Sequence, residues 1–144
     1  MRLYLIAVGQ RMPAWVEAGF AEYAKRLPPH LKPHLVEIAA GRRGRGADIE
    51  RLVRDEGERI RAATPPGARV IALERTGRAL DTGQVAATLT RAQQEGRDLA
   101  FWIGGPEGLA PEILRQAHEQ WSLSALTLAH PIVRVVWAEQ LYRA

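Results

Sequence analysis

Short apolar runs alternate with helical patterns along this 144-residue chain, and this alternation restricts its fold more than any other feature. Apolar runs bounded by Gly or Pro predict strands, and apolar residues at helical spacing predict helices between them. We therefore expect one α/β domain over residues 1–144, with a mainly parallel sheet and helices on both of its faces. The expected strands are 2–8, 34–40, 69–74, 98–103 and a strand or extended loop over 121–128; the expected helices are 14–27, 48–61, 82–95, 109–119 and 132–143.

The position of a ligand site follows from this arrangement. The run 98–103 is nearly all apolar, which is typical of a central strand. In open parallel sheets, ligands bind beyond the carboxyl ends of the strands. The candidate site therefore lies at the loops after Leu73, after Ile103 and around residues 123–128.

Composition excludes several classes of function. The chain has no cysteine, so it has no disulfide, no thiol nucleophile and no sulfur ligand for a metal. Its four histidines lack metal-ligand spacing, and we expect no bound metal. No apolar run has the length of a membrane span or the pattern of a signal peptide. We expect a cytoplasmic protein with no membrane partner.

The net charge of +4 comes almost entirely from arginine and has two explanations. One is the base composition of a GC-rich genome. The other is an anionic partner, because guanidinium groups match phosphate geometry and stack on bases. Arg42, Arg43 and Arg45 lie between glycines, in either a phosphate-contacting loop or a solvated basic loop. Charges of alternating sign over residues 48–61 predict a solvated helix face.

The segment Gly104-Gly-Pro-Glu-Gly108 links an expected strand to an expected helix. Its glycines let the backbone approach a ligand closely, and a tight turn without a ligand is the alternative. The segment lacks both G-K-S/T and G-x-G-x-x-G, which argues against nucleoside triphosphate and nicotinamide sites. Glu107 either binds a ribose hydroxyl or caps a helix, and His130 is either a base or a helix cap. Capping is favoured for both.

Several of these motifs, taken together, are specific. Ile103-Gly-Gly-Pro-Glu-Gly-Leu109, Ser122-Leu-Ser-Ala-Leu-Thr-Leu128, His130-Pro and Glu139-Gln-Leu-Tyr-Arg-Ala144 resemble the ribosomal RNA large-subunit methyltransferase H family, a member of the SPOUT class. Blocks at residues 6–9, 12–15 and 41–44 extend the resemblance over essentially the whole chain, in the same order and spacing.

This resemblance implies a SPOUT-like α/β fold whose C-terminal part forms a deep trefoil knot. It also implies S-adenosyl-L-methionine as the methyl donor. The adenine ring of such a donor needs apolar walls and a few backbone hydrogen bonds. Carried over by motif, the donor-binding residues are Leu73, Gly104, Gly105, Leu123, Ser124, Ala125, Leu126, Thr127 and Leu128.

The resemblance further implies a homodimer that methylates N3 of a pseudouridine in large-subunit (23S) ribosomal RNA, within the assembled ribosome. Arg143 and Arg134 are the candidates to stabilise the deprotonated base or a phosphate, and Tyr142 and Glu139 are the candidates to shape the pocket. Dimer packing and ion pairing on the last helix are the alternative roles of these four residues.

The chain departs from the family pattern at two points. Ala129 stands where proline is common, and the family usually continues beyond Leu141-Tyr-Arg-Ala144 with a tail that covers the active site of the partner subunit. We therefore expect retained donor binding and dimerisation with methyl transfer weakened or lost. The alternatives are a donor- and RNA-binding homodimer with weak or no turnover, and a nucleotide-binding α/β domain without an RNA partner.

Overall fold

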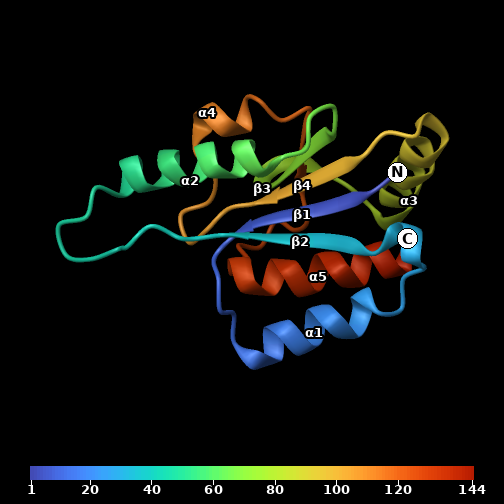
Figure 1. Ribbon diagram of the computed structural model, residues 1–144, viewed down its shortest axis with the longest axis horizontal. Coiled ribbons are helices and arrows are strands. Elements are labelled where there is room, and N and C mark those ends of the chain that lie inside the picture. The colour runs from blue at the N-terminus through green and yellow to red at the C-terminus, as the bar shows by residue number, and fades with distance from the viewer.

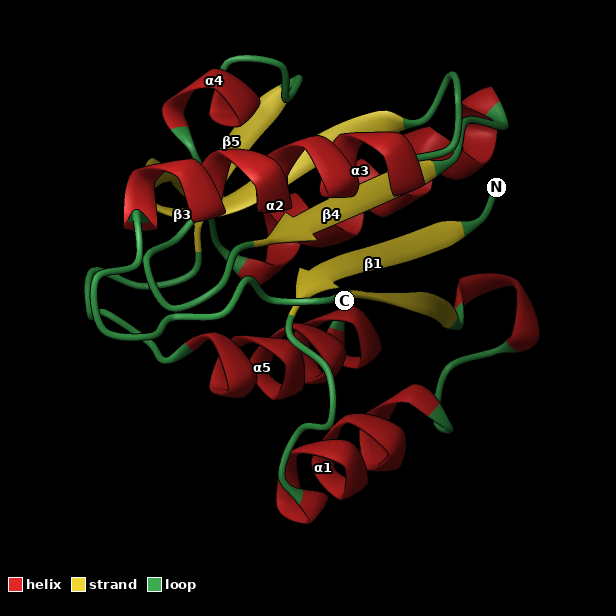
Figure 2. Cartoon of the chain, turned by 60° about the vertical axis from the view of Figure 1, so that its left-hand side comes forward, coloured by secondary structure: helices red, strands yellow, loops and turns green.

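The computed structural model describes all 144 residues, which form a five-stranded sheet between layers of helices (Figures 1 and 2). The strands are β1 (Leu3–Val8), β2 (Pro33–Ile38), β3 (Arg69–Ala79), β4 (Leu99–Ile103) and β5 (Glu119–Ser122). The helices are α1 (Ala14–Ala24), α2 (Ile49–Ala63), α3 (Thr82–Glu95), α4 (Pro111–Leu114) and α5 (His130–Arg143), with a 3₁₀ turn at Pro29–Leu31.

All strands of the sheet run parallel, in the order β2-β1-β4-β3-β5. This confirms the expected α/β architecture. Strand β4 lies at the centre, as its apolar sequence predicts, and all five of its residues are buried. The trefoil knot stays a prediction. A knot is defined by how one segment passes through a loop of the chain, and the pairing of the strands does not test this.

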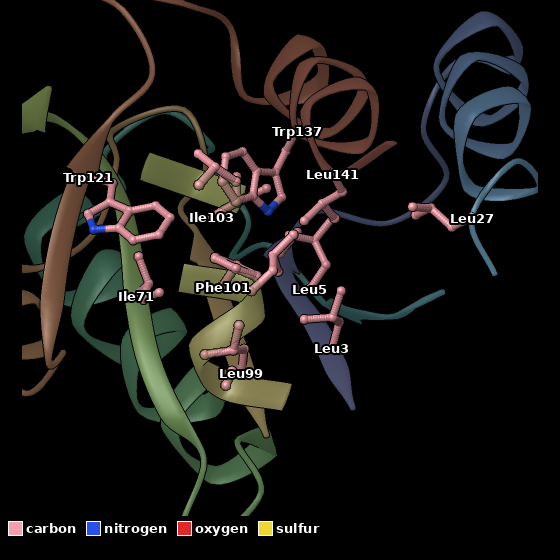
Figure 3. Packing of buried hydrophobic residues seen from close by; sticks show 14 residues of the cluster. Leu3, Leu5, Leu27, Ile71, Leu99, Phe101, Ile103, Trp121, Trp137 and Leu141 are labelled. Carbon is pink, nitrogen blue, oxygen red and sulfur yellow. The ribbon is translucent and has the colours of Figure 1, made fainter. Parts of the chain in front are cut away.

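Two apolar cores hold the helices on the two faces of the sheet. On one face, Ile60 of α2 and Ile113 of α4 pack with Trp102. On the other face, Trp137 of α5 packs its ring at a steep angle against Phe101, with ring centroids 4.8 Å apart, beside Trp121 (Figure 3). Helix α3 joins this second core, and α1 covers α5 from outside.

The helix predicted over residues 109–119 is wrong in extent. Helix α4 ends at Leu114, and Glu119–Ser122 form β5 at the edge of the sheet beside β3. His118 starts this pairing: its N–H donates to the Val70 carbonyl, and its Nδ1 accepts from the Val70 N–H. The pairing buries Trp121, so tertiary packing overrides local helical spacing.

Strand β3 continues beyond the predicted end at Glu74 to Ala79, with a bulge in its pairing to β5. Leu73 and Arg78 both pair with Trp121, so the residues between them leave the ladder. Gly77 permits this irregularity, because a Cβ there would lie 2.6 Å from the Gln120 backbone. No helix of the chain is long and apolar enough to cross a membrane.

Candidate functional site

A cavity of about 750 Å³ lies beyond the carboxyl ends of β4 and β5 and beside Leu73, Glu74 and Arg75, where β3 leaves its ladder with β5. This is the edge of the sheet that the parallel arrangement predicts. Its size is that of a small-molecule or cofactor site. The wall consists of Leu73, Glu74 and Arg75, residues 103–108, Leu123, Ser124, residues 126–129, His130, Pro131 and Val133. The structure therefore brings eight of the nine expected donor-binding residues to one cavity. Ala125 lies in the same segment but outside the wall.

Close backbone packing explains the glycines after β4. A Cβ on Gly104 would lie 2.4 Å from the carbonyl carbon of Gly108, too close for any side chain. The Gly108 N–H donates to the Gly105 carbonyl at 3.0 Å and closes the turn. Helix α4 begins only at Pro111 with Ala110 as its N-cap, so the predicted capping role of Glu107 is wrong.

The segment between β5 and α5 forms the apolar wall of the cavity. Ser122 Oγ donates to the Ser124 carbonyl and Ser124 Oγ accepts from the Leu126 N–H, both at 2.9 Å, which folds the segment into a turn. The remaining main-chain N–H groups of residues 123–128 donate no hydrogen bond to the protein. Leu126 is 73% exposed and lines the cavity. The wall thus offers apolar surface and free backbone groups to a ligand.

His130 is the first residue of α5 and also lines the cavity. Ala129 is the N-cap, so the predicted capping role of His130 is wrong. Burial, reinforced by the nearby Arg134 and Arg43 guanidinium groups, lowers the pKa of His130 from its ordinary 6.5. The imidazole is therefore uncharged at neutral pH.

Acidification below pH 6.5 is expected to destabilise the fold. Burial also lowers the pKa of His118, whose Nδ1 accepts a hydrogen bond from Val70. In the unfolded chain both imidazoles recover the ordinary pKa of 6.5, so the unfolded state binds protons first as the pH falls. The free energy of unfolding is then highest above 6.5 and decreases as the pH drops through 6.5 toward the lowered folded values.

Urea unfolding at about pH 7.5 and about pH 5.5 measures this dependence. The double variant His118→Gln/His130→Gln is expected to lose most of the difference between the two pH values. Equal dependence in the variant and the parent chain would contradict the assignment to these histidines. The pKa values of Glu107 and Glu119 are lowered from 4.5, so these carboxylates change the free energy of unfolding only below that pH, outside the pH range of these unfolding measurements.

An ion-pair cluster behind the cavity wall joins three segments of the chain. Arg43 donates to both oxygens of Glu56 and to Glu107, with Nη2 2.7 Å from Glu107 Oε2. The Gly41 N–H donates to Glu56 Oε2 at 2.9 Å. A Cβ on Gly105 would lie 3.5 Å from Arg43 Nη2, so the cluster lies directly behind that glycine. The two carboxylates raise the pKa of Arg43, and Arg43 lowers that of Glu107.

The sequence does not predict this cluster. The side chain of Glu56 is only 2% exposed, so the expectation of a fully solvated face on α2 is wrong at this position. The glycine-flanked Arg43 stands out in the sequence as a charged loop residue. Its two carboxylate partners lie 13 and 64 positions away, and no local pattern indicates them.

Arg134 is buried within this chain. Its side chain is 2% exposed; Nη1 pairs with Glu37 Oε2 and Nη2 donates to the Gly9 carbonyl, both at 2.7 Å. These bonds tie α5 to the carboxyl ends of β1 and β2. Arg134 lies outside the cavity wall, and both of its terminal nitrogens already have acceptors, whereas its buried Nε has none.

Glu139, Tyr142 and Arg143 lie at the other end of α5 from the cavity. Arg143 Nε donates to Glu139 Oε2 at 2.6 Å, and Tyr142 packs near Tyr23 of α1. A rise of about 1.5 Å per residue separates Arg143 from His130 by roughly 20 Å. One copy of the chain therefore does not bring the four expected catalytic residues to its own cavity.

Comparison with known proteins extends these observations. The family model described as predicted SPOUT methyltransferase matches residues 1–144. Ribosomal RNA large subunit methyltransferase H of Acidithiobacillus ferrooxidans is 56% identical over the whole chain, which covers 90% of that protein. Its namesake from Pseudomonas paraeruginosa is 53% identical, with all of this chain and 93% of that protein covered.

Solved structures with little sequence similarity share the fold. The AdoMet-bound rRNA methyltransferase from Sinorhizobium meliloti matches 99% of this chain with a TM-score of 0.52 and 12% identity. The SpoU methyltransferase AviRb from Streptomyces viridochromogenes, also in complex with AdoMet, matches 99% with a TM-score of 0.51 and 15% identity. This chain spans only 56% and 57% of those two chains.

These comparisons agree with the geometry. The motifs that carry the resemblance, Gly-Gly-Pro-Glu-Gly and Leu-Ser-Ala-Leu-Thr-Leu, supply two walls of one cavity at the carboxyl edge of the sheet. The family match covers every residue, and the relatives exceed half identity over that length. The chain belongs to the SPOUT methyltransferase family.

Proposed function

We propose that this chain transfers a methyl group from S-adenosyl-L-methionine to N3 of a pseudouridine in large-subunit ribosomal RNA. The observation that carries the proposal is the cavity itself, because the two motifs on which the resemblance to the rRNA methyltransferases rests form its walls. A ribosomal substrate also supports a cytoplasmic location.

The residues of the cavity fit this donor. Leu73, Leu126 and Leu128 supply apolar surface for the adenine ring, and the unpaired backbone groups of residues 123–128 supply hydrogen bonds to its edge. Gly104 and Gly105 present their backbone to the cavity, and their lack of side chains lets that backbone pack closely against Gly108 and Val8. When bound, S-adenosylmethionine supplies an electrophilic methyl group on sulfur.

The chain contributes chiefly by orienting the reactants. Alignment of a nucleophile with an electrophilic methyl group removes up to about 7–11 kcal/mol of barrier in favourable cases. The rigid turn at Gly104–Gly108 and the start of α5 hold the cavity walls in fixed positions. The uncharged His130 in the wall adds no positive charge to a site for a cationic donor.

Catalysis in this proposal requires a second copy of the chain. Glu139, Tyr142 and Arg143 lie roughly 14–20 Å along α5 from His130 in the cavity wall, so we assign them to the cavity of a partner copy. Large exposed side chains on α1 and α5 support a homodimer, since Trp15 of α1 is 59% exposed and Ile132 and Tyr142 of α5 are 39% and 45% exposed. In the dimer, Arg143 is assigned to stabilise the negative charge that develops on the target base.

Leu126→Ala tests the donor site. We expect S-adenosylmethionine to bind about tenfold more weakly, because part of an apolar wall is lost. The melting temperature is expected to remain unchanged, because Leu126 is exposed. Isothermal titration calorimetry measures the affinity, with Leu35→Ala on β2 as a control that removes an exposed leucine outside the cavity. Equal affinity of the two variants for S-adenosylmethionine would show that Leu126 does not contact the donor.

Methyl transfer is tested separately, with labelled S-adenosylmethionine and ribosomes that lack the modification. Incorporation of label into large-subunit rRNA supports methyl transfer by this chain. Donor and ribosome binding without incorporation would support the alternative, a donor- and RNA-binding homodimer with weak or no turnover.

A further inference from the structure

The loop between β2 and α2 extends past the carboxyl edge of the sheet (Figure 1). We call residues 41–46 of this loop the arginine arm. Gly44 and Gly46 in the arm have no atom near the position of a Cβ, so this part stands free of the body. The arm is nevertheless fixed at its base, where Gly41 and Arg43 bind the buried carboxylate of Glu56.

The anchor is more elaborate than a solvated loop requires. Glu56 is a buried carboxylate, and a buried charge is costly unless partners surround it. Arg43 is itself mostly buried and divides its guanidinium between Glu56 and Glu107. Because Glu107 lines the cavity, this arrangement sets the position of the arm relative to the cavity wall.

Arg42 and Arg45 flank this anchor and are exposed. Neither forms an ion pair or a hydrogen bond through its side chain, in contrast to Arg26, which pairs with Glu22. Free guanidinium groups bind phosphate oxygens through two parallel hydrogen bonds. Two such groups on a loop that is anchored beside the donor cavity offer contacts to the phosphates of a nucleic-acid strand.

We propose that the arginine arm is an RNA-binding element, and that Arg43 is the positioning residue that fastens it to the donor cavity. Arg42 and Arg45 contact phosphates of the RNA segment that carries the target nucleotide. This proposal rests on the proposed function, because it takes the substrate to be RNA and the cavity to hold the methyl donor.

The double variant Arg42→Ala/Arg45→Ala tests the contacts. We expect KM for ribosomes to rise about tenfold with kcat nearly unchanged, because charge-assisted contacts to phosphate are lost. The salt dependence of ribosome binding is expected to flatten, by roughly 0.7 in log–log slope for each lost phosphate contact. Affinity for S-adenosylmethionine, measured by calorimetry, is expected to stay the same.

Arg91→Ala is the matched control. Arg91 is an exposed arginine of α3 with no ion pair, and it lies outside the cavity wall. If this variant changes KM and the salt slope as much as one arm substitution does, the effect is general charge and the proposal is overturned. Wild-type protein that methylates no RNA overturns the proposed function instead, so the two failures are distinguishable.

Arg43→Lys tests whether Arg43 holds the arginine arm in position beside the cavity. Lysine keeps a positive charge beside Glu56 but cannot present a planar fork to two carboxylates. We expect kcat/KM for ribosomes to fall at least as far as in the double variant, while circular dichroism stays native. Arg43→Gln is expected to be worse than Arg43→Lys, because it leaves the carboxylate of Glu56 without a cation. Unchanged kcat/KM in folded Arg43→Lys would overturn the role of Arg43.

Discussion

Gly104→Ala is expected to weaken binding of S-adenosylmethionine by about 10- to 100-fold, because the added methyl group costs about 1–3 kcal/mol of overpacking in the cavity wall. The methyl carbon would lie 2.4 Å from the Gly108 carbonyl carbon and 2.8 Å from the Leu109 nitrogen. Both neighbours are backbone atoms, which cannot rotate away. The turn must open, and the wall made by Gly104 and Gly105 moves.

Gly44→Ala is the matched control for this prediction. Gly44 has open space around the position of its Cβ and no positive φ, so alanine fits there. Calorimetric titration of both variants, after far-UV circular dichroism shows that they are folded, separates a local from a general effect. Donor affinity retained in folded Gly104→Ala would mean that the donor does not bind against this turn.

Arg134→Met is expected to lower the free energy of unfolding by about 2–3 kcal/mol, since it removes a buried ion pair and hydrogen bonds to backbone carbonyls. Methionine retains much of the side-chain volume, so the loss is chiefly electrostatic. Glu37 remains partly exposed to water, which keeps the cost below that of a fully buried orphan charge. The Gly9 carbonyl loses a donor at 2.7 Å.

Arg143→Met, on the same helix, serves as the comparison. Its guanidinium is exposed and pairs only with Glu139 one turn away, so we expect a loss below about 0.5 kcal/mol. In the proposed function Arg143→Met instead reduces kcat, whereas Arg134→Met acts through stability. Similar unfolding curves for the two variants would contradict the structural role of Arg134.

Most of the fold is predictable from the sequence because its signals are local. Strand β4 reads as a central strand since every residue in it is apolar, and the capping box at Asp81 and Gln84 marks the start of α3. The cavity edge follows from the same reasoning, because the carboxyl ends of parallel strands meet there.

The parts that the sequence does not predict depend on distant partners. The helix predicted over residues 109–119 includes residues 115–119, yet pairing of His118 with Val70 continues the chain into an edge strand. Glu56 looks like one acid on a charged helix, and its burial depends on Arg43. Arg134 and Arg143 are both arginines of the last predicted helix, and no sequence pattern distinguishes them. Only the packing of α5 buries Arg134 and leaves Arg143 exposed.

The position of the transferred methyl group on the rRNA shows whether this chain is the proposed pseudouridine methyltransferase. Ribosomes lacking the modification are incubated with this protein and S-adenosylmethionine, and nucleosides of the large-subunit rRNA are analysed by mass spectrometry. We expect one new product, N3-methylpseudouridine, whose yield falls with Gly104→Ala and persists with Arg91→Ala, an exposed arginine outside both the cavity wall and the arginine arm. A methyl group on another nucleoside, or the same yield from both variants, would contradict the proposed function.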